Sequence, residues 1–207
     1  MAVSPAKENI LKRIRKALSN PVPLPFPLSE GNNSVYPPPA DELEVIFAET
    51  FTGLQGKFAY CLDEKDMIDQ LNGLIKAKEW TKIFCKETQW AEQYSNTISL
   101  ATCDASITGC ECLVARTGSM VLSAAGESGR TTSVYAPVHI CIAYTHQLVY
   151  DVKDALQFLK EKYAGNIPSF ISFATGPSRT ADIEKTLVTG VHGPKEVYLF
   201  LIEKALP

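Results

Sequence analysis

Two glycine-containing motifs near the carboxyl end of the chain combine residue types that bind small anions. The first is Gly-Pro-Ser-Arg-Thr-Ala-Asp at 176–182, and the second is Gly-Val-His-Gly-Pro at 190–194. Arg179 offers a planar, bidentate partner for a carboxylate or a phosphate. His192 could act as an acid, a base or a hydrogen-bond donor near neutral pH. We therefore expect the stretch 175–194 to hold a small anionic ligand, with Arg179, Asp182 and His192 as the candidate catalytic residues.

A helix start is expected within the first motif, because Ser178 or Thr180 can cap a helix that follows the strand-like run 169–174. Unpaired backbone N–H groups at such a start suit an anion. Asp182 in the first turn would repel that anion, so it could instead orient Arg179 or accept a proton. A capped turn with a surface arginine is the alternative. The predicted ligand contacts in the two motifs are Gly176, Pro177, Ser178, Arg179, Thr180 and Gly193.

Hydroxyls, glycines and one arginine also flank a strand predicted at 119–124. They could wrap an anion, although they fit neither a P-loop nor a dinucleotide-binding fingerprint. A flexible connecting loop is the alternative. His139 opens the next predicted strand and is either a ligand contact or a core histidine. The predicted contacts in this region are Thr117, Gly118, Ser119, Gly126, Gly129, Arg130 and His139.

The cysteines do not form a metal-binding pattern. Cys103, Cys110 and Cys112 have the spacing C-x6-C-x-C, with no Cys-x-x-Cys pair and no nearby histidine. No Gly-x-Ser-x-Gly or His-Glu-x-x-His motif is present, so the usual hydrolase signatures are missing. We therefore expect no metal and no evident cofactor in this chain.

Alternating helices and strands are predicted around these motifs. This alternation indicates an α/β fold with a mostly parallel sheet and helices on both faces. Ligands bind outside the carboxyl ends of such strands, so the loops after 119–124 and 169–174 are expected to build the site. The predicted helices are 41–54, a helix capped by Asp63, 87–94 and 151–163; the predicted strands are 57–62, 81–85, 97–101, 119–124, 138–144, 169–174 and 196–203.

Three segments are expected along the chain: an N-terminal helix within 1–19, a proline-rich linker at 20–39 and the α/β domain at 40–207. The helix is amphipathic over 6–18, with Ile10, Ile14 and Leu18 on one face and basic residues elsewhere. Docking on its own domain or on a partner subunit explains this face better than a membrane surface, because the face is short and has no aromatic anchor. A homo-oligomer is one possible form of such docking.

Composition excludes several classes of protein. The 207 residues carry 20 basic and 23 acidic side chains, and this balance argues against nucleic acid as the main partner. No apolar run approaches the ~20 residues that span a bilayer. The first residues are polar and lack the apolar core of a signal peptide. We therefore expect a cytoplasmic protein with reduced thiols.

The motifs together resemble the LUD domain family, specifically the lactate utilization protein C (LutC/YkgG) group. The resemblance covers nearly the whole chain, including the basic N-terminal helix and the proline linker. Cys110, Glu111 and Cys112 depart from the family pattern, so no role is transferred to them. The matching segments are Ile107-Thr108-Gly109, Ala115-Arg116-Thr117-Gly118-Ser119, Gly129-Arg130, Pro137-Val138-His139, 176–184 and 190–194.

The resemblance implies a fold shared with sugar-phosphate isomerases, CoA transferases and 5-formyltetrahydrofolate cyclo-ligase (NagB/RpiA/CoA transferase-like). It also implies a role in oxidising L-lactate to pyruvate beside two iron–sulfur partner proteins, with this chain as the component that lacks clusters. The bound anion would be a hydroxy acid, a phosphate or a nucleotide-like molecule. Two alternatives stay open: a free-standing transferase, ligase or isomerase acting on a phosphorylated or CoA-linked substrate, and a non-catalytic regulatory binding module.

Overall fold

The computed structural model describes residues 5–19, 36–94, 98–180 and 188–203. The chain divides into two compact units, residues 1–38 and residues 39–207. The first unit contains α1 (Pro5–Leu18), close to the predicted helix, and its Ile10, Ile14 and Leu18 side chains are exposed. No helix among the described residues is long and apolar enough to cross a membrane.

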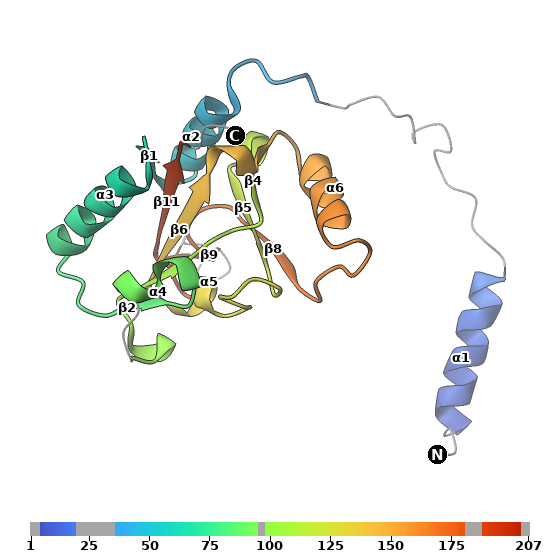
Figure 1. Ribbon diagram of the computed structural model, residues 1–207. Coiled ribbons are helices and arrows are strands. Elements are labelled where there is room, and N and C mark those ends of the chain that lie inside the picture. The colour runs from blue at the N-terminus through green and yellow to red at the C-terminus, as the bar shows by residue number, and fades with distance from the viewer. Residues whose placement is uncertain (1–4, 20–35, 95–97, 181–187, 204–207) are drawn as a thin grey trace. The chain divides into compact units, whose positions relative to one another are not determined.

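A five-stranded sheet forms the centre of the second unit, and all of its strands run parallel (Figure 1). The mostly parallel sheet expected from the sequence is therefore confirmed. In order across the sheet, the strands are β1 (Lys57–Cys61), β11 (Glu196–Ile202), β6 (Val138–Tyr144), β3 (Ala105–Thr108) and β2 (Ile83–Cys85).

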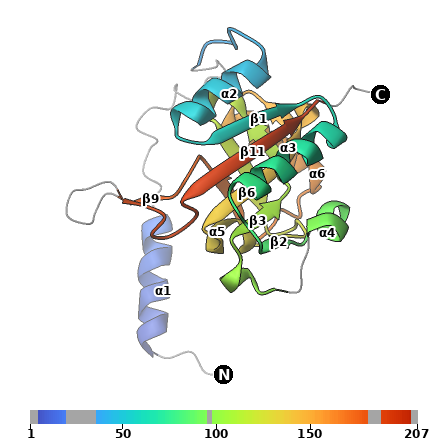
Figure 2. The same ribbon diagram turned by 90° about the vertical axis from the view of Figure 1, so that its left-hand side faces the viewer.

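One face of this sheet is covered by α3 (Glu64–Ala77) and α4 (Thr88–Tyr94). Figure 2 shows α3 in front of β1 and β11. Asp63 caps α3, as expected, because its side chain accepts a hydrogen bond from the Asp66 backbone N–H at 2.7 Å. The helical spacing of Met67 and Leu71 brings both side chains into the buried core against the sheet.

The other face is covered by α2 (Leu43–Gly53) and by a second sheet that the sequence did not reveal. Helix α6 (Val152–Lys162) covers the outer face of that second sheet, on the opposite side of the unit from α3 (Figure 1). The second sheet has the order β7 (Leu148–Val149), β4 (Cys112–Val114), β5 (Ser119–Ser123) and β8 (Ile171–Ala174).

Two predictions about strands are wrong. Residues 98–99 have no regular structure and Leu100–Thr102 form a short 3-10 helix, so no strand occupies the described part of 97–101. The strands predicted at 119–124 and 169–174 correspond to β5 and β8, which are antiparallel neighbours in the second sheet. Their carboxyl ends therefore lie at opposite ends of that sheet, and the loops after them do not meet as expected.

A helix start at Ser178 is also wrong, and the alternative, a helix capped by Thr180, falls on residues outside the described ranges. Strand β9 (Arg179–Thr180) pairs antiparallel with β10 (Val188–Thr189). The Ser178 N–H donates to Pro194 O at 2.9 Å, and the Gly190 N–H donates to Ser178 O at 2.9 Å. These bonds to the second motif satisfy backbone groups that a helix start would leave free. The predicted helix interior, including Asp182, lies outside the described residues.

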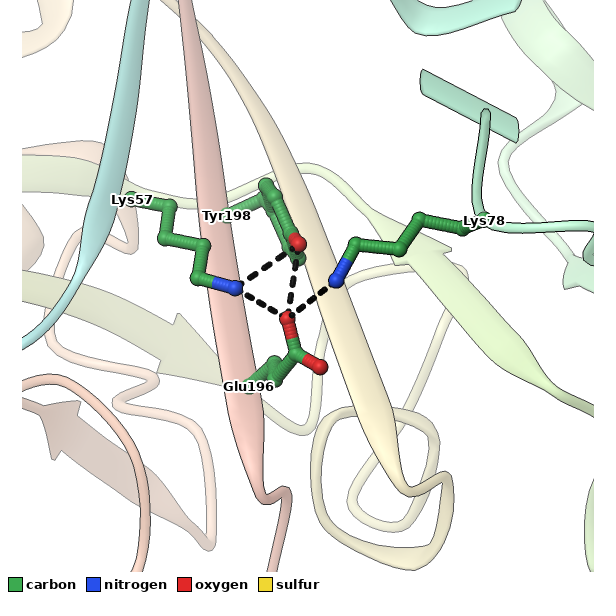
Figure 3. A network of polar contacts seen from close by, with 4 residues as sticks. All are labelled: Lys57, Lys78, Glu196 and Tyr198. Carbon is green, nitrogen blue, oxygen red and sulfur yellow. Dashed lines mark hydrogen bonds and ion pairs between the residues drawn. The ribbon is translucent and has the colours of Figure 1, made fainter. Parts of the chain in front are cut away.

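A network of charged side chains joins β1, β11 and the end of α3 (Figure 3). Lys57 forms an ion pair with Glu196, which also accepts hydrogen bonds from Lys78 at 3.3 Å and from the Tyr198 hydroxyl at 2.7 Å. The hydrogen bond from Lys57, together with the other two donors, lowers the pKa of Glu196 to about 2 despite its partial burial. The network ties the first residues of two neighbouring strands together.

Candidate functional site

A cavity of about 180 Å³ lies between the two sheets, and we name it the histidine cavity. Strands β6 and β11 form one wall, and β5 and β8 form the other. The helix α5 (Thr132–Tyr135) and the two glycine motifs complete its lining. The lining residues are Leu122, Ser133, Val134, His139, Ser172, Ala174, Gly176, Ser178, His192, Gly193, Pro194 and Val197.

His139 is the buried polar group of this cavity, with 2% of its surface exposed. Its Nε2 lies 2.8 Å from Thr108 Oγ1. Burial lowers the pKa of His139 to about 4, so the ring is neutral at physiological pH. A neutral imidazole can either donate a hydrogen bond to a ligand or accept one, depending on its tautomer.

The other polar groups around His139 are three hydroxyls and a second histidine. Ser133, Ser172 and Ser178 offer hydroxyls, and His192 lies at the exposed side. No carboxylate lines this cavity within the described part of the chain. His192 also lines a surface hollow with Lys195. These donors, with no opposing negative charge, suit a small carboxylate or phosphate.

The two glycine motifs meet at this cavity because their backbones approach closely. The Ser178 N–H bonds to Pro194, and a Cβ on Gly193 would lie 2.9 Å from the Ser178 Cβ. A glycine at 193 is therefore needed for this contact. The structure brings together five of the residues predicted from the sequence: His139, Gly176, Ser178, His192 and Gly193.

Arg179 and the neighbouring glycines pack on the end of α2. The Arg179 guanidinium donates to Leu54 O, and a Cβ on Gly176 would lie 2.8 Å from the same oxygen. Gly118 has a φ of +59°, and a Cβ there would lie 2.9 Å from the Phe51 backbone N. These motif residues hold the second sheet and the β9–β10 hairpin against α2.

A chain of hydroxyls links two of the predicted segments. Ser119 Oγ lies 2.7 Å from Thr117 Oγ1 and 2.9 Å from Thr175 Oγ1. Pro177 is buried, and Thr180 pairs with Val188 in the hairpin. None of Thr117, Ser119, Pro177 and Thr180 lines the histidine cavity.

The remaining predicted residues lie elsewhere. Gly126 and Gly129 line a different cavity, and the Arg130 guanidinium donates to Ser169 Oγ at 2.5 Å and lies 5.8 Å from the Phe170 ring centre. The loop 126–130 follows β5 at the end opposite to Gly176, as the antiparallel pairing with β8 requires. The structure therefore does not bring this loop together with Arg179.

The cavity that contains Gly126 and Gly129 belongs to a crevice at the carboxyl ends of β2, β3 and β6. It consists of two hollows of about 320 and 360 Å³ that share Glu87, Gly109 and Cys110, and we name it the carboxyl-end crevice. Ser133 and Leu122 line both this crevice and the histidine cavity. The Thr108–His139 hydrogen bond crosses from one to the other, because Thr108 lines the crevice.

Glu111 is the most enclosed charge of the crevice, with 6% of its surface exposed. It accepts hydrogen bonds from Ser123 Oγ at 2.5 Å, from the Tyr163 hydroxyl at 2.7 Å and from Lys162 Nζ at 2.7 Å. Burial alone would raise the pKa of this carboxyl, but the three donors and the Lys162 charge hold it below its usual value. Glu111 is therefore ionised at neutral pH and paired.

The thiol of Cys110 also faces the crevice. Its hydrogen bond to Cys141 and its burial raise the pKa of this thiol well above the usual value. Cys110 is therefore protonated at neutral pH and is not an activated nucleophile. Within the described ranges, no group of three or more histidine, cysteine, aspartate or glutamate side chains is placed to hold a metal ion.

Sequence reasoning missed the crevice residues Glu87, Glu111 and Lys162. Glu87 could have been found from the sequence, because it follows the predicted strand at 81–85 and therefore lies at the carboxyl end of that strand, where ligands bind. The strand β3 was not recognised because it has only four residues, and its end at Thr108 places Gly109 and Glu111. Lys162 and Tyr163 come from the end of α6, which sequence spacing alone could not place near Glu111.

Comparison with known proteins decides the family, because the LUD domain family model matches residues 40–202. The chain belongs to the LUD domain family. The resemblance stated from the motifs is thereby confirmed. A "Lactate utilization protein C" of Bacillus licheniformis is 33% identical over 137 residues, which cover 64% of this chain and 57% of that relative. The Bacillus subtilis protein of the same name is 31% identical over 135 residues, covering 63% and 56%.

An uncharacterized protein of Neisseria meningitidis serogroup B is 37% identical over 100 residues, or 48% of this chain and 42% of that relative. The chain thus spans about half the length of the curated relatives it matches. A crystal structure of a DUF162 family protein from Deinococcus radiodurans has a TM-score of 0.58 at 16% identity, covering 80% of this chain and 99% of that one. This similarity supports the α/β fold of the LUD domain.

Proposed function

We propose that this LUD domain protein is the component of an L-lactate utilization system that binds a small carboxylate in the histidine cavity. Two findings support the role: relatives named "Lactate utilization protein C" match more than half of the chain, and the cavity holds polar groups without a carboxylate among the described residues. The observation that carries the site is the His139 imidazole, which is buried, lines the cavity and is held through Nε2 by Thr108.

The cavity offers a distinct contact for each end of a 2-hydroxy acid. The serine hydroxyls and His192 would donate to the carboxylate, and His139 would face the hydroxyl group. If Nε2–H donates to Thr108, Nδ1 carries a lone pair and can accept a hydrogen bond from the ligand hydroxyl. Oxidation of lactate to pyruvate releases two electrons and two protons. In this proposal His139 orients the hydroxyl group, iron–sulfur partner proteins would take the two electrons, and the two protons would pass to solvent.

Calorimetric titration of the full-length protein with L-lactate and with pyruvate tests the site. We expect His139→Gln to weaken lactate binding at least tenfold, because the ring nitrogen that faces the cavity is lost. Arg130→Gln is the matched control, since it removes a cation that contacts Ser169 outside the cavity, and it should bind lactate like the native protein. Equal affinities in the native protein and His139→Gln would overturn the proposal, as would lactate that does not bind at all.

Growth on lactate in a host that depends on this protein gives a second measurement. We expect His139→Gln to abolish growth while the protein still accumulates. Arg179→Ala should also reduce growth, but through lower stability, because Arg179 donates to the backbone of Leu54 at the end of α2. Arg179→Ala protein that is as stable as native yet fails to bind lactate would instead restore Arg179 to the ligand site.

A free-standing transferase, ligase or isomerase for phosphorylated or CoA-linked substrates receives less support. Such substrates carry several negative charges, and the carboxyl-end crevice presents three glutamates and one lysine among its described lining residues. Carboxylates repel phosphate groups at short range. Turnover of a phosphorylated or CoA-linked substrate by the purified protein alone would favour the free-standing enzyme instead. If the protein binds lactate but His139→Gln does not change growth on lactate, a regulatory module would be favoured.

A further inference from the structure

The carboxyl-end crevice has the position of a ligand site in an open parallel sheet. Its two hollows share Glu87, Gly109 and Cys110, so they form one continuous space along the ends of β2, β3 and β6. Ligands of such sheets bind outside the carboxyl ends of the strands. The crevice is also larger than the histidine cavity, since its hollows measure about 320 and 360 Å³ against about 180 Å³.

The charges of the crevice disfavour an anion. Glu64, Glu87 and Glu111 contribute three carboxylates, and Lys162, the single lysine or arginine among the described lining residues, already pairs with Glu111. No ion-pair partner of Glu87 is found in the described part of the chain. A phosphate or carboxylate would meet uncompensated negative charge there.

Glu87 has one oxygen free for a ligand. Its Oε1 accepts a hydrogen bond from Ser128 Oγ at 2.5 Å. Its Oε2 faces Gly109. A Cβ built on this glycine would lie 3.7 Å from Oε2, and the Glu87 carboxyl group would be its only neighbour within 4 Å among the described residues. The glycine therefore leaves an open approach to a carboxylate oxygen that accepts hydrogen bonds from a donor such as a hydroxyl.

Hydrogen-bond donors alternate with acceptors along the rest of the crevice. The Tyr144 hydroxyl donates to Glu64 at 2.8 Å and accepts from Gln89 at 2.6 Å. In the other hollow the Ser128 hydroxyl already donates to Glu87, whereas Lys162, which donates to Glu111, has further N–H donors. An organic cation could pair with Glu87, but it could not accept from the remaining Lys162 N–H groups and the Lys162 charge would repel it. A hydroxyl group both donates and accepts, so a ligand with several hydroxyls matches both kinds of partner.

Flat side chains line the second hollow. The rings of Tyr144 and His146 stack with centroids 5.6 Å apart and planes at 27°, and Trp90 lines the same hollow. Aromatic faces of this kind pack against the C–H face of a sugar ring or against a nucleobase. Stacking surface and hydroxyl partners therefore occur side by side in one space.

We propose that the carboxyl-end crevice is a second binding site that takes a neutral, hydroxyl-rich ligand, either a carbohydrate or a nucleoside. Glu87 accepts a hydrogen bond from a ligand hydroxyl, and the Tyr144–His146 pair packs against the ring. This site is independent of the carboxylate proposed for the histidine cavity, since its ligand carries no negative charge.

Ligand-observed NMR and calorimetry on the full-length protein test the proposal with D-ribose, D-glucose, adenosine, inorganic phosphate and spermidine. We expect a neutral probe to bind and phosphate and spermidine to bind more weakly. Tighter binding of adenosine identifies a nucleoside, and equal or tighter binding of the free sugars identifies a carbohydrate. Either result supports the proposal.

Two variants locate the binding. Glu87→Gln should weaken the neutral probe at least tenfold, whereas Glu127→Gln should change its affinity less than twofold. Glu127 is the matched control because it contacts Thr88 and does not line the crevice. If Glu87→Gln folds poorly, Tyr144→Phe replaces it and should weaken the probe several-fold. The proposal is overturned by absence of neutral-probe binding at millimolar concentration, by tighter binding of phosphate or spermidine, or by equal losses in Glu87→Gln and Glu127→Gln.

Discussion

The histidine cavity and the carboxyl-end crevice share two wall residues, Leu122 and Ser133, yet they present opposite chemistry. The histidine cavity has neutral and donor groups around a buried imidazole, whereas the crevice has more carboxylates than cations among its described lining residues. Neighbouring cavities of one fold can therefore select ligands of different charge. The Thr108–His139 hydrogen bond is the contact through which occupation of one could affect the other.

The largest expected difference is the stability lost when a glycine of each region is replaced by alanine. Gly118 and Gly129 both have positive φ, but a Cβ on Gly118 would meet the Phe51 backbone at 2.9 Å while Gly129 has nothing within 4 Å. Gly118 packs on α2 beside the Ser119–Thr175 hydroxyl pair, and Gly129 lines the crevice. We expect Gly118→Ala to reduce the free energy of unfolding by about 4 kcal/mol and Gly129→Ala by about 1 kcal/mol.

Urea denaturation of both variants measures this difference. The larger loss combines a left-handed backbone with a clash against a backbone that cannot move aside. Similar losses in the two variants would show that Gly118 is not a packing glycine, and the motif around it would then return to the list of ligand contacts.

Titration of His139 should give the next largest effect. The ring titrates at 6.5 when unfolded and at about 4 when folded, so the folded state binds fewer protons between these values. Stability is therefore complete above about pH 6.5 and falls as the pH drops toward 4, by about 3 kcal/mol. Denaturation curves between pH 4 and 7 measure this loss, and His139→Gln should remove this contribution to the pH dependence.

The crevice should respond to acid in a lower range, because Glu111 has a lowered pKa. Its contribution is present above about pH 4.5 and is lost below it. Lys162→Met removes the paired cation, so burial then raises the pKa of Glu111 and the acid loss begins at higher pH. We expect about 2 kcal/mol lower stability at neutral pH, because Lys162 is partly exposed and water replaces some of its effect.

Lys160→Met is the control for this second titration, since Lys160 is exposed on the same helix. It should leave both the stability and its pH dependence unchanged. A Lys162→Met protein that keeps the native acid profile would show that Ser123 and Tyr163 alone hold the pKa of Glu111 below its usual value.

The sequence was sufficient for features governed by local spacing. Helical periodicity and the Asp63 cap located α3, and long apolar runs located β6 and β11. The motif residues His139, Ser178 and His192, which were selected from the sequence as site residues, line one cavity, and their binding role stays a prediction. The second sheet could not be predicted as a whole, because β5 pairs with β8 (Met120 with Ala174) and β4 with β7 (Leu113 with Leu148) across long separations that no local pattern encodes. The β4–β5 pairing is a local hairpin that was not recognised from the sequence.

Arg179 shows for a single side chain that local sequence does not predict long-range contacts. Its type and its neighbours predict an anion contact, but in the folded chain its guanidinium donates to Leu54, which lies far away in the sequence. Glu111 illustrates the reverse case. Its partners come from two separate segments, Ser123 in β5 and Lys162 and Tyr163 at the end of α6, so the surroundings of this carboxylate are visible only after folding.

The smallest expected effect comes from a region outside both cavities. Glu196 accepts hydrogen bonds from Lys57, Lys78 and Tyr198, and these donors lower its pKa to about 2 (Figure 3). A carboxyl with a lowered pKa stabilises the fold above about pH 4.5 and loses this effect as the pH falls toward 2. Because its side chain is 33% exposed, solvent screens the ion pairs, and Glu196→Gln should lower the free energy of unfolding by only about 0.5 to 1 kcal/mol, and by less at high salt.

Both lactate and the neutral probe should bind Glu196→Gln with native affinity. Loss of either affinity would mean that the amino ends of β1 and β11 are coupled to a cavity, and the two-region division of the molecule would have to be extended to include them.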